Sequence, residues 1–200
     1  MAKQKVDEAT IIKESLKLFR RKSYHTTTMA DIAKACGLLK GSLYHYFSSK
    51  EELMKKVIAG VHQFFKQEVF SHAYNEVLTP VERFERMLKK SESIFIDKET
   101  GQIEGNIGVE TTLVIPEFKP IIQAFFRDFF DAIKTIYATK YSDEIANELA
   151  ERAVAEVEGA IMLSRVFEDK SYLLNTHKRL LTRLEVQGSK SEVQSSKFKV

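Results

Sequence analysis

The amino-acid sequence predicts an all-α protein. Glycine and proline occur 8 and 3 times in the 200 residues, and the alternation of apolar and polar residues that marks a half-buried strand is nearly absent. Apolar residues recur instead at the helical spacing of about 3.6, beginning with Ala9, Ile12, Leu16 and Phe19. These patterns predict about eight to ten helices, divided between a small N-terminal domain of three helices and a larger helical domain.

Residues 23–28 interrupt this repeat and separate the first helix from a second. Thr28 is a preferred N-cap residue, and the acidic Asp31 three positions later complements the positive start of a helix. Gly37 fits the position after a helix, where a positive φ is easily adopted. The second helix is therefore expected to carry the apolar residues Met29, Ile32, Ala33 and Cys36.

A third helix follows Gly37 after a turn of three to four residues, which is the spacing of a helix-turn-helix. Ala33, Gly37 and Leu43 lie at relative positions 0, +4 and +10. The small residue lets the two helices cross closely, the glycine makes the turn, and Leu43 anchors the third helix. Leu43 and Phe47 are expected to face inward, which leaves on the outside Lys40, Gly41, Ser42, Tyr44 and His45.

Capping residues and prolines mark the remaining helices. Ser49 with Glu52 indicates a capping box that opens a helix running to about Tyr74. Pro80 stands at the tolerated first position of another helix, which is expected to end near residue 97. Further helices are expected near 107–115, 117–139, 143–168 and 171–186, with Pro116 and Pro120 punctuating the first two.

These elements predict three regions along the chain. An N-terminal domain is expected over residues 1–50, with the helix from about 49 as its link to the rest. A larger domain is expected over 51–186. The polar segment 187–200 lacks the apolar residues that a packed core requires and is expected to be a disordered tail.

Charge is distributed unevenly between these regions. Residues 1–60 contain 12 Lys and Arg against 6 Asp and Glu, whereas residues 61–200 contain 19 against 22. The excess of positive charge suits an anionic partner for the N-terminal domain. The charge alone is equally consistent with a lysine-rich surface that serves only to keep the protein soluble.

Other features narrow the classes of protein. No apolar run approaches the roughly 20 residues that span a bilayer, and the N-terminus has no apolar segment of a secretory signal. A single cysteine excludes an intramolecular disulfide and a cysteine-rich metal site. We therefore expect a cytoplasmic protein without membrane contact, metal or cofactor.

The N-terminal segment resembles the DNA-binding domain of the TetR family of bacterial transcriptional regulators. The resemblance covers about residues 9–53 and includes the run IIKESLKLFRRKSYHTTTMADIAKACGLLKGSLYHYFSSKEEL. It implies that the helix near 39–46 enters the DNA major groove and that Tyr44, Lys50 and Thr28 hold phosphates. The expected DNA-contacting residues are Thr27, Thr28, Leu39, Lys40, Gly41, Ser42, Tyr44, His45 and Lys50.

Two positions depart from the family pattern. Ser23 stands where the family usually has glycine, which predicts strain or a different local geometry in that turn. Leu39 stands where the family usually has a Ser or Thr cap, and a missing cap costs typically about 1 kcal/mol. Leu39 could instead meet a thymine methyl group, which leaves open which bases are recognised.

The larger domain is expected to bind a small effector, as in the family. Its many aromatic residues form either an ordinary core or a mainly apolar pocket for a hydrophobic or flat aromatic compound. Glu110, Gln123 and Arg127 are candidates for orienting such a compound. The expected effector-contacting residues are Phe64, Met87, Phe95, Glu110, Gln123, Phe126, Arg127 and Phe130.

The last two helices carry a wide face of small and apolar residues. Such a face is expected to form a four-helix dimer interface with a second copy, or else to belong to the core of one chain. A two-fold dimer would present two recognition helices to a pseudo-palindromic operator. The expected interface residues are Ala153, Val157, Ala160, Ile161, Ser164, Leu173, Leu180 and Leu184.

The function predicted from these features is a homodimeric, ligand-responsive transcriptional regulator, most simply a repressor. Its expected partners are a double-stranded DNA operator, a small-molecule effector and a second copy of the chain. An enzyme is the first alternative, but the sequence contains no phosphate-binding loop, nucleophile elbow or HExxH motif. A carrier of hydrophobic molecules with a vestigial DNA domain is the second.

Overall fold

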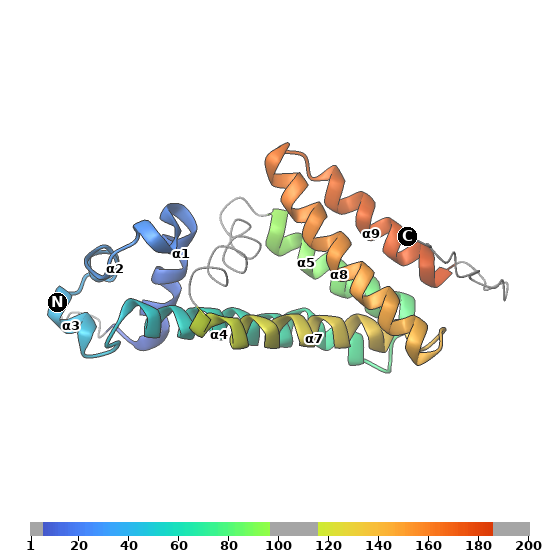
Figure 1. Cartoon of the computed structure of the whole chain (residues 1–200), viewed down its shortest axis with the longest axis horizontal. Helices are drawn as coiled ribbons and strands as arrows, with labels where there is room; N and C mark the ends of the chain where they lie inside the picture. The colour runs from blue at the N-terminus through green and yellow to red at the C-terminus, as the bar shows by residue number, and fades with distance from the viewer. Residues whose placement is uncertain (1–5, 97–115, 186–200) are drawn as a thin grey trace, which may run out of the picture.

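The computed structural model of the chain describes residues 6–96 and 116–185. All regular elements in these two ranges are helical, which confirms the predicted all-α fold (Figure 1). Within the same ranges no helix combines the length and apolarity needed to cross a membrane. The elements are α1 Glu8–Thr26, α2 Met29–Ala35, α3 Lys40–Tyr44, α4 Lys50–Glu68, η1 Phe70–Tyr74, α5 Pro80–Ile96, η2 Pro116–Phe118, α7 Lys119–Tyr137, α8 Asp143–Val166 and α9 Ser171–Glu185.

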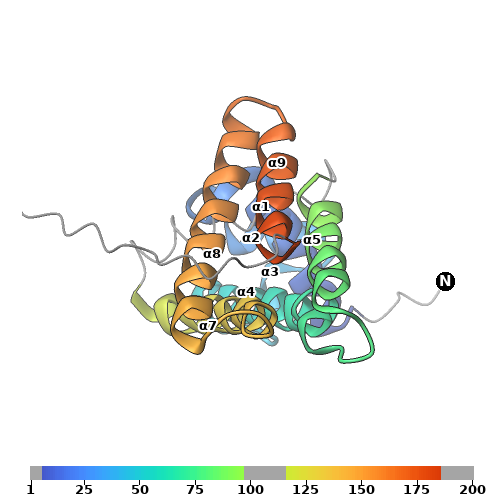
Figure 2. The same cartoon turned by 90° about the vertical axis from the view of Figure 1, so that its right-hand side faces the viewer.

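The described residues form two hydrophobic cores. The first lies among α1–α4 and contains Ile11, Ile32, Leu43 and Leu53, each fully buried. The second lies among α4, η1, α5, α7, α8 and α9. Figures 1 and 2 show α2 and α3 at one end of the molecule and α8 and α9 toward the other, with α4 and α7 side by side along its length.

Several expected helix ends are confirmed by their caps. Thr28 and Asp31 form a reciprocal capping box at the start of α2. Ser49 caps α4 by accepting a hydrogen bond from the Glu52 N–H. The carboxylate of Glu52, however, accepts from the N–H and hydroxyl of Ser48 rather than from the Ser49 backbone. The second half of the expected capping box is therefore shifted by one residue.

The predicted interruption at 23–28 is confirmed at its start, because α1 is broken at Ser23, where φ is 66° and ψ is 163°, before a last helical turn to Thr26. Two expected boundaries are corrected. The expected helix 49–74 divides at Val69 into α4 and the 3-10 turn η1. The recognition helix is shorter than expected, at Lys40–Tyr44. The helix expected near 107–115 and the tail 187–200 lie outside the described residues.

Candidate nucleic-acid interface

A rigid turn joins α2 to α3. Gly37 has φ of 66°, as expected for the residue that follows a helix. Its N–H donates to the Lys34 carbonyl at 3.1 Å, and the Leu38 N–H donates to the Ala33 carbonyl at 2.8 Å. This pair of bonds is a Schellman motif, which satisfies the last carbonyls of α2. The motif fixes the direction in which the chain leaves α2.

Two apolar side chains anchor α3 from behind. Leu43 and Phe47 are both buried in the N-terminal core, as the sequence predicted. The Tyr46 hydroxyl also connects this segment to the residues before α1, because it donates a hydrogen bond to the Val6 carbonyl at 2.8 Å. Because a helix of five residues has little stability of its own, this packing holds α3 in place.

The opposite face of α3 is open to solvent. The side chains of Leu39 and Tyr44 are 79% and 44% exposed, and Ser42 is half-buried. The exposed set also contains Lys40, Gly41 and His45. The face thus combines hydrogen-bond donors, a cation and one apolar side chain, the groups that proteins use for phosphates and base edges. The structure brings together the central residues of the expected DNA contact.

The two threonines before α2 have separate roles. Thr27 is fully buried, and its hydroxyl donates to the Ser23 carbonyl at 2.6 Å. The expectation that Thr27 contacts DNA is therefore corrected, because its side chain cannot reach a phosphate. Thr28 is exposed, but its hydroxyl donates to Asp31 at 2.7 Å. The hydrogen bonds from Thr28, and then that from Lys22, lower the pKa of Asp31 to about 2.

Lys50 is engaged within the domain. Its Nζ donates to the carbonyls of Tyr24 and Thr27 at 2.9 and 3.0 Å, and lies 4.2 Å from the centre of the Tyr24 ring. The Tyr24 hydroxyl in turn donates to Glu51 at 3.1 Å. Burial, and then this contact with Glu51, raise the pKa of Tyr24. Two of its three donors thus join α4 to the end of α1, and the expected phosphate contact of Lys50 stays a prediction.

The larger domain reaches into the N-terminal core through side chains of η2 and α7 that the sequence did not indicate. Phe118, at the end of η2, is fully buried and packs edge-on against Tyr24, with ring centres 5.7 Å apart and planes at 90°. Ile122, one turn into α7, belongs to the same core. The prolines at 116 and 120 marked this segment, but periodicity alone does not say which core a phenylalanine joins.

The expected effector-contacting residues do not converge. Gln123 and Arg127 lie exposed on α7, so their expected orienting role inside a pocket is corrected. Phe64 is also exposed. Met87 is buried in the second core, where Phe126 and Phe130 are partly buried. The side chain of Phe95 and all of Glu110 lie outside the described residues.

A compact aromatic cluster occupies the place where α4, η1 and α7 meet. Phe65, Phe70, Phe125 and Phe129 lie with ring centres between 5.3 and 6.3 Å apart. Most of these pairs are tilted or edge-on, which the charge distribution of aromatic rings favours. These four phenylalanines therefore form an ordinary hydrophobic core, which was the alternative to an effector pocket.

A buried histidine is a polar feature of the second core whose partner the sequence did not indicate. His177 on α9 is 3% exposed, and its Nδ1 lies 2.6 Å from Oε1 of Glu92 on α5. Since a carboxylate accepts, Nδ1 carries the proton; Nε2 has no partner among the described residues. Burial lowers the pKa of His177, although the Glu92 contact acts in the opposite direction. Its burial was predictable, because His177 continues the stripe of Leu173 and Leu180.

The expected dimer residues face the interior of their own chain. All except Ser164, which is half-buried, are buried in the second core. The intrachain alternative is therefore correct for them, and they are not available to a second copy. The exposed face of α8 instead carries Met162 and Val166, 59% and 67% exposed, followed by Phe167 at 60%.

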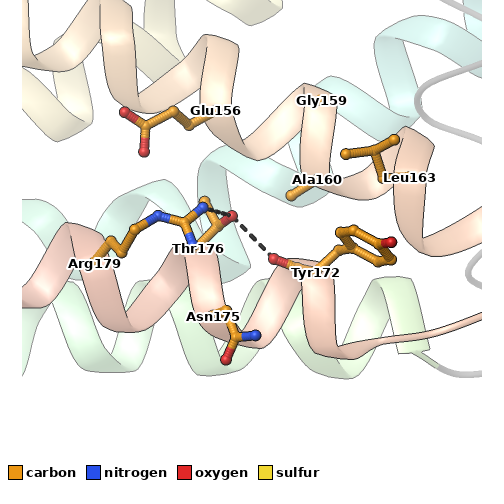
Figure 3. A pocket seen from close by; sticks show the side chains of 8 residues that line it. All are labelled: Glu156, Gly159, Ala160, Leu163, Tyr172, Asn175, Thr176 and Arg179. Carbon is orange, nitrogen blue, oxygen red and sulfur yellow. Dashed lines mark hydrogen bonds between the residues drawn. The ribbon is translucent and has the colours of Figure 1, made fainter.

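A pocket of about 240 Å³ lies beside this face, between α8 and α9. Figure 3 shows its lining, with Gly159, Ala160 and Leu163 from α8 opposite residues of α9. On the α9 side, Arg179 donates to the Thr176 hydroxyl at 2.6 Å. The floor is made of small residues, so a side chain from another molecule has room to enter. The remaining lining residues are Glu156, Tyr172 and Asn175.

Comparison with known proteins agrees with this arrangement. Residues 11–57 match the N-terminal model of bacterial regulatory proteins of the tetR family. Residues 80–179 match the C-terminal domain of LmrA/YxaF-like transcriptional regulators. The HTH-type transcriptional regulator YxaF of Bacillus subtilis is 30% identical over 172 residues, which cover 82% of this chain and 87% of that protein.

Solved structures show the same fold. A TetR transcriptional regulator from Legionella pneumophila aligns with a TM-score of 0.80 at 19% identity, covering 92% of this chain and 99% of that one. SmeT, the repressor of the Stenotrophomonas maltophilia multidrug efflux pump SmeDEF, aligns with a TM-score of 0.68 at 19% identity, covering 90% of each chain. The two domain matches and the similarity to YxaF show that the chain belongs to the TetR family, whose members are transcriptional regulators and not enzymes.

Proposed function

We propose that the protein is a homodimeric transcriptional repressor that binds a pseudo-palindromic operator and is released by a small hydrophobic or aromatic effector. The observation that carries the proposal is the exposed face of α3. Lys40, Tyr44 and His45 project from a short helix whose other side is fixed by buried Leu43 and Phe47. We further propose that it acts in the cytoplasm, where an operator is accessible.

The division of labour on this face follows from chemistry. The Tyr44 hydroxyl and the Lys40 ammonium suit phosphate oxygens, and phosphate contacts set the register of a protein on DNA. Lys40, Ser42 and His45 can also donate to base edges in the major groove. Residues 1–60 carry twice as many basic as acidic side chains, 12 against 6, which favours the approach to DNA.

Binding to DNA tests this proposal directly. Genomic fragments selected on the purified protein should contain a shared site whose affinity falls steeply with salt. Tyr44→Phe should weaken binding by about tenfold per half-site, the cost of one hydrogen bond to a charged group. Lys89→Ala is the control, because this exposed lysine lies on α5, away from α3. Binding without sequence preference, or unaltered by Tyr44→Phe, would contradict the proposal.

The exposed apolar side of α8 is our proposed contact with the second copy. Met162, Val166 and Phe167 cluster beside the pocket between α8 and α9. A protruding methionine and a pocket on one face suit a two-fold interface, in which each copy offers the same surface to the other. A face of this kind on a soluble protein commonly marks an interaction site.

Substitution of this face tests the dimer. Met162→Glu should convert the dimer to a monomer in sedimentation and light-scattering measurements, because it places a charge in an apolar contact. The control is Val77→Glu, which changes a residue 94% exposed in the loop before α5. A Met162→Glu protein that remains dimeric would place the interface elsewhere.

Effector release requires a physical link between the two domains, and Phe118 supplies one. Its ring is buried against Tyr24, whose carbonyl and ring hold Lys50 at the start of α4. A compound that favours a different position of η2 and α7 would move Phe118, and through Tyr24 it would change the position of the DNA-binding domain. Such a shift requires different affinities of the compound for the two positions.

A hydrophobe carrier is the alternative that the same experiments separate. A carrier would bind its cargo with equal affinity in wild type and in Tyr44→Phe, and neither protein would select an operator. The exposed donors on α3 favour the repressor, because a carrier has no use for them.

A further inference from the structure

Two neighbouring leucines have opposite environments. Leu38 is partly buried against the N-terminal core, whereas the side chain of Leu39 is 79% exposed. Leu39 is the N-cap residue of α3, and its side chain makes no capping hydrogen bond. Its backbone carbonyl accepts from the N–H groups of Ser42 and Leu43 at 2.9 and 3.2 Å. The backbone is therefore fixed, while the side chain contributes neither a cap nor core packing within the described residues.

A single exposed leucine is ordinary on protein surfaces, but the position of this one is specific. It precedes Lys40 directly at the start of α3 and is exposed, as are Tyr44 and His45 in the same segment. A leucine has no donor or acceptor, so it cannot contact phosphates or polar base edges with any gain. The apolar group that base pairs offer in the major groove is the 5-methyl group of thymine.

We propose that Leu39 recognises thymine through its 5-methyl group, at one position in each half-site of the operator. The inference rests on the proposed operator binding and adds to it which base this residue selects. A Ser or Thr here would cap α3 and could donate to several bases. Leu39 can make neither the cap nor hydrogen bonds to bases. It can make an apolar contact with the 5-methyl group that thymine provides.

Uracil substitution tests this contact, because uracil lacks only the 5-methyl group. Each thymine of the selected operator is replaced in turn, and the Kd is measured by fluorescence anisotropy. At one symmetric position the wild type should lose about fourfold per half-site, or about 0.8 kcal/mol, the transfer free energy of one such group. Leu39→Ala should bind the thymine and uracil operators equally. Tyr44→Phe is the matched control, and it should weaken both operators while retaining their ratio.

The possible results separate this inference from the function on which it rests. A wild type that selects an operator but shows no loss at any uracil position overturns the role of Leu39 and leaves the repressor proposal intact. The same holds if Leu39→Ala, or Leu39→Ser as a second variant, retains the full uracil effect. A wild type that selects no operator overturns both. Because Leu39 is exposed, both variants should fold, and circular dichroism checks this.

Discussion

At the scale of single residues, the backbone at Ser23 carries strain. Its φ of 66° and ψ of 163° lie in a region that is essentially restricted to glycine, and such residues cost of order 1–3 kcal/mol. The Thr27 hydroxyl donates to the Ser23 carbonyl and holds the break in place. The departure from the family glycine had indicated strain, and the structure confirms the conformation that causes it.

Ser23→Gly should therefore stabilise the protein by about 1 kcal/mol, since glycine adopts this conformation without steric cost. Urea unfolding followed by circular dichroism measures the change. Ser93→Gly, at an exposed position within α5, is the control and should destabilise by about 0.5 kcal/mol. A loss of stability in Ser23→Gly would show that the break is not strained.

His177 makes the stability of the second core dependent on pH. Burial holds its pKa below the ordinary 6.5 in the folded chain. The unfolded chain thus binds a proton more readily, so the stabilisation is present above pH 6.5 and is lost as pH falls toward the folded pKa. Unfolding free energy should fall as pH drops below about 6.5, and His177→Gln should flatten this part of the profile.

The matched control for that profile is His45→Gln, which replaces an exposed histidine. It should leave the pH dependence as in the wild type. Equal slopes in His177→Gln and wild type would mean that other groups determine the acid sensitivity.

At the scale of elements, α3 is held by its surroundings rather than by its own sequence. It has five residues, Lys40–Tyr44, and its N-cap residue Leu39 makes no side-chain capping hydrogen bond. Leu39→Ser should add a cap and raise the unfolding free energy by about 1 kcal/mol. Ser49→Ala, which removes the cap of α4, should lower it by a similar amount. If Leu39→Ser changes neither stability nor operator preference, the account of this position is wrong.

The elements also show what a sequence can predict. Thr28 and Gly37 act within a few residues of their own positions, so their roles at the two ends of α2 were predictable. The buried stripe of α8 was predictable too, but its partner was not. A small-residue face can pack against a helix of its own chain or of a second copy, and here α8, with Ala153 and Ala160 in the core, packs against α7 and α9 of the same chain. The internal hydrogen bonds of Lys50 were not predictable for a similar reason, because their acceptors are backbone carbonyls more than 20 residues earlier in the chain.

At the scale of the whole molecule, side chains of η2 and α7 join the two cores. Phe118 and Ile122 belong by sequence to the larger domain and by packing to the N-terminal core. Away from them, α4 and α7 are linked by Asp128, whose carboxylate lies 2.8 Å from His62 and 3.1 Å from Lys66. Burial raises the pKa of Asp128, but its contacts with Lys66 and His62 outweigh burial and lower it.

Phe118→Ala should destabilise the protein by about 3–5 kcal/mol, because it leaves a cavity under Tyr24. Phe118→Leu should restore most of that loss. If Phe118 also positions the DNA-binding domain, Phe118→Leu should accept operators with altered half-site spacing that the wild type rejects. An unaltered spacing preference would reduce Phe118 to a packing role.

Footprinting of the selected operator with hydroxyl radicals tests the central claim most directly, namely that the exposed face of α3 docks on DNA twice in each complex. The account predicts two symmetric protected patches, centred about 34–36 Å or a multiple of that apart. Both patches should fade together in Tyr44→Phe and in Met162→Glu. A single patch, uniform protection, or a footprint that survives both substitutions would contradict the account.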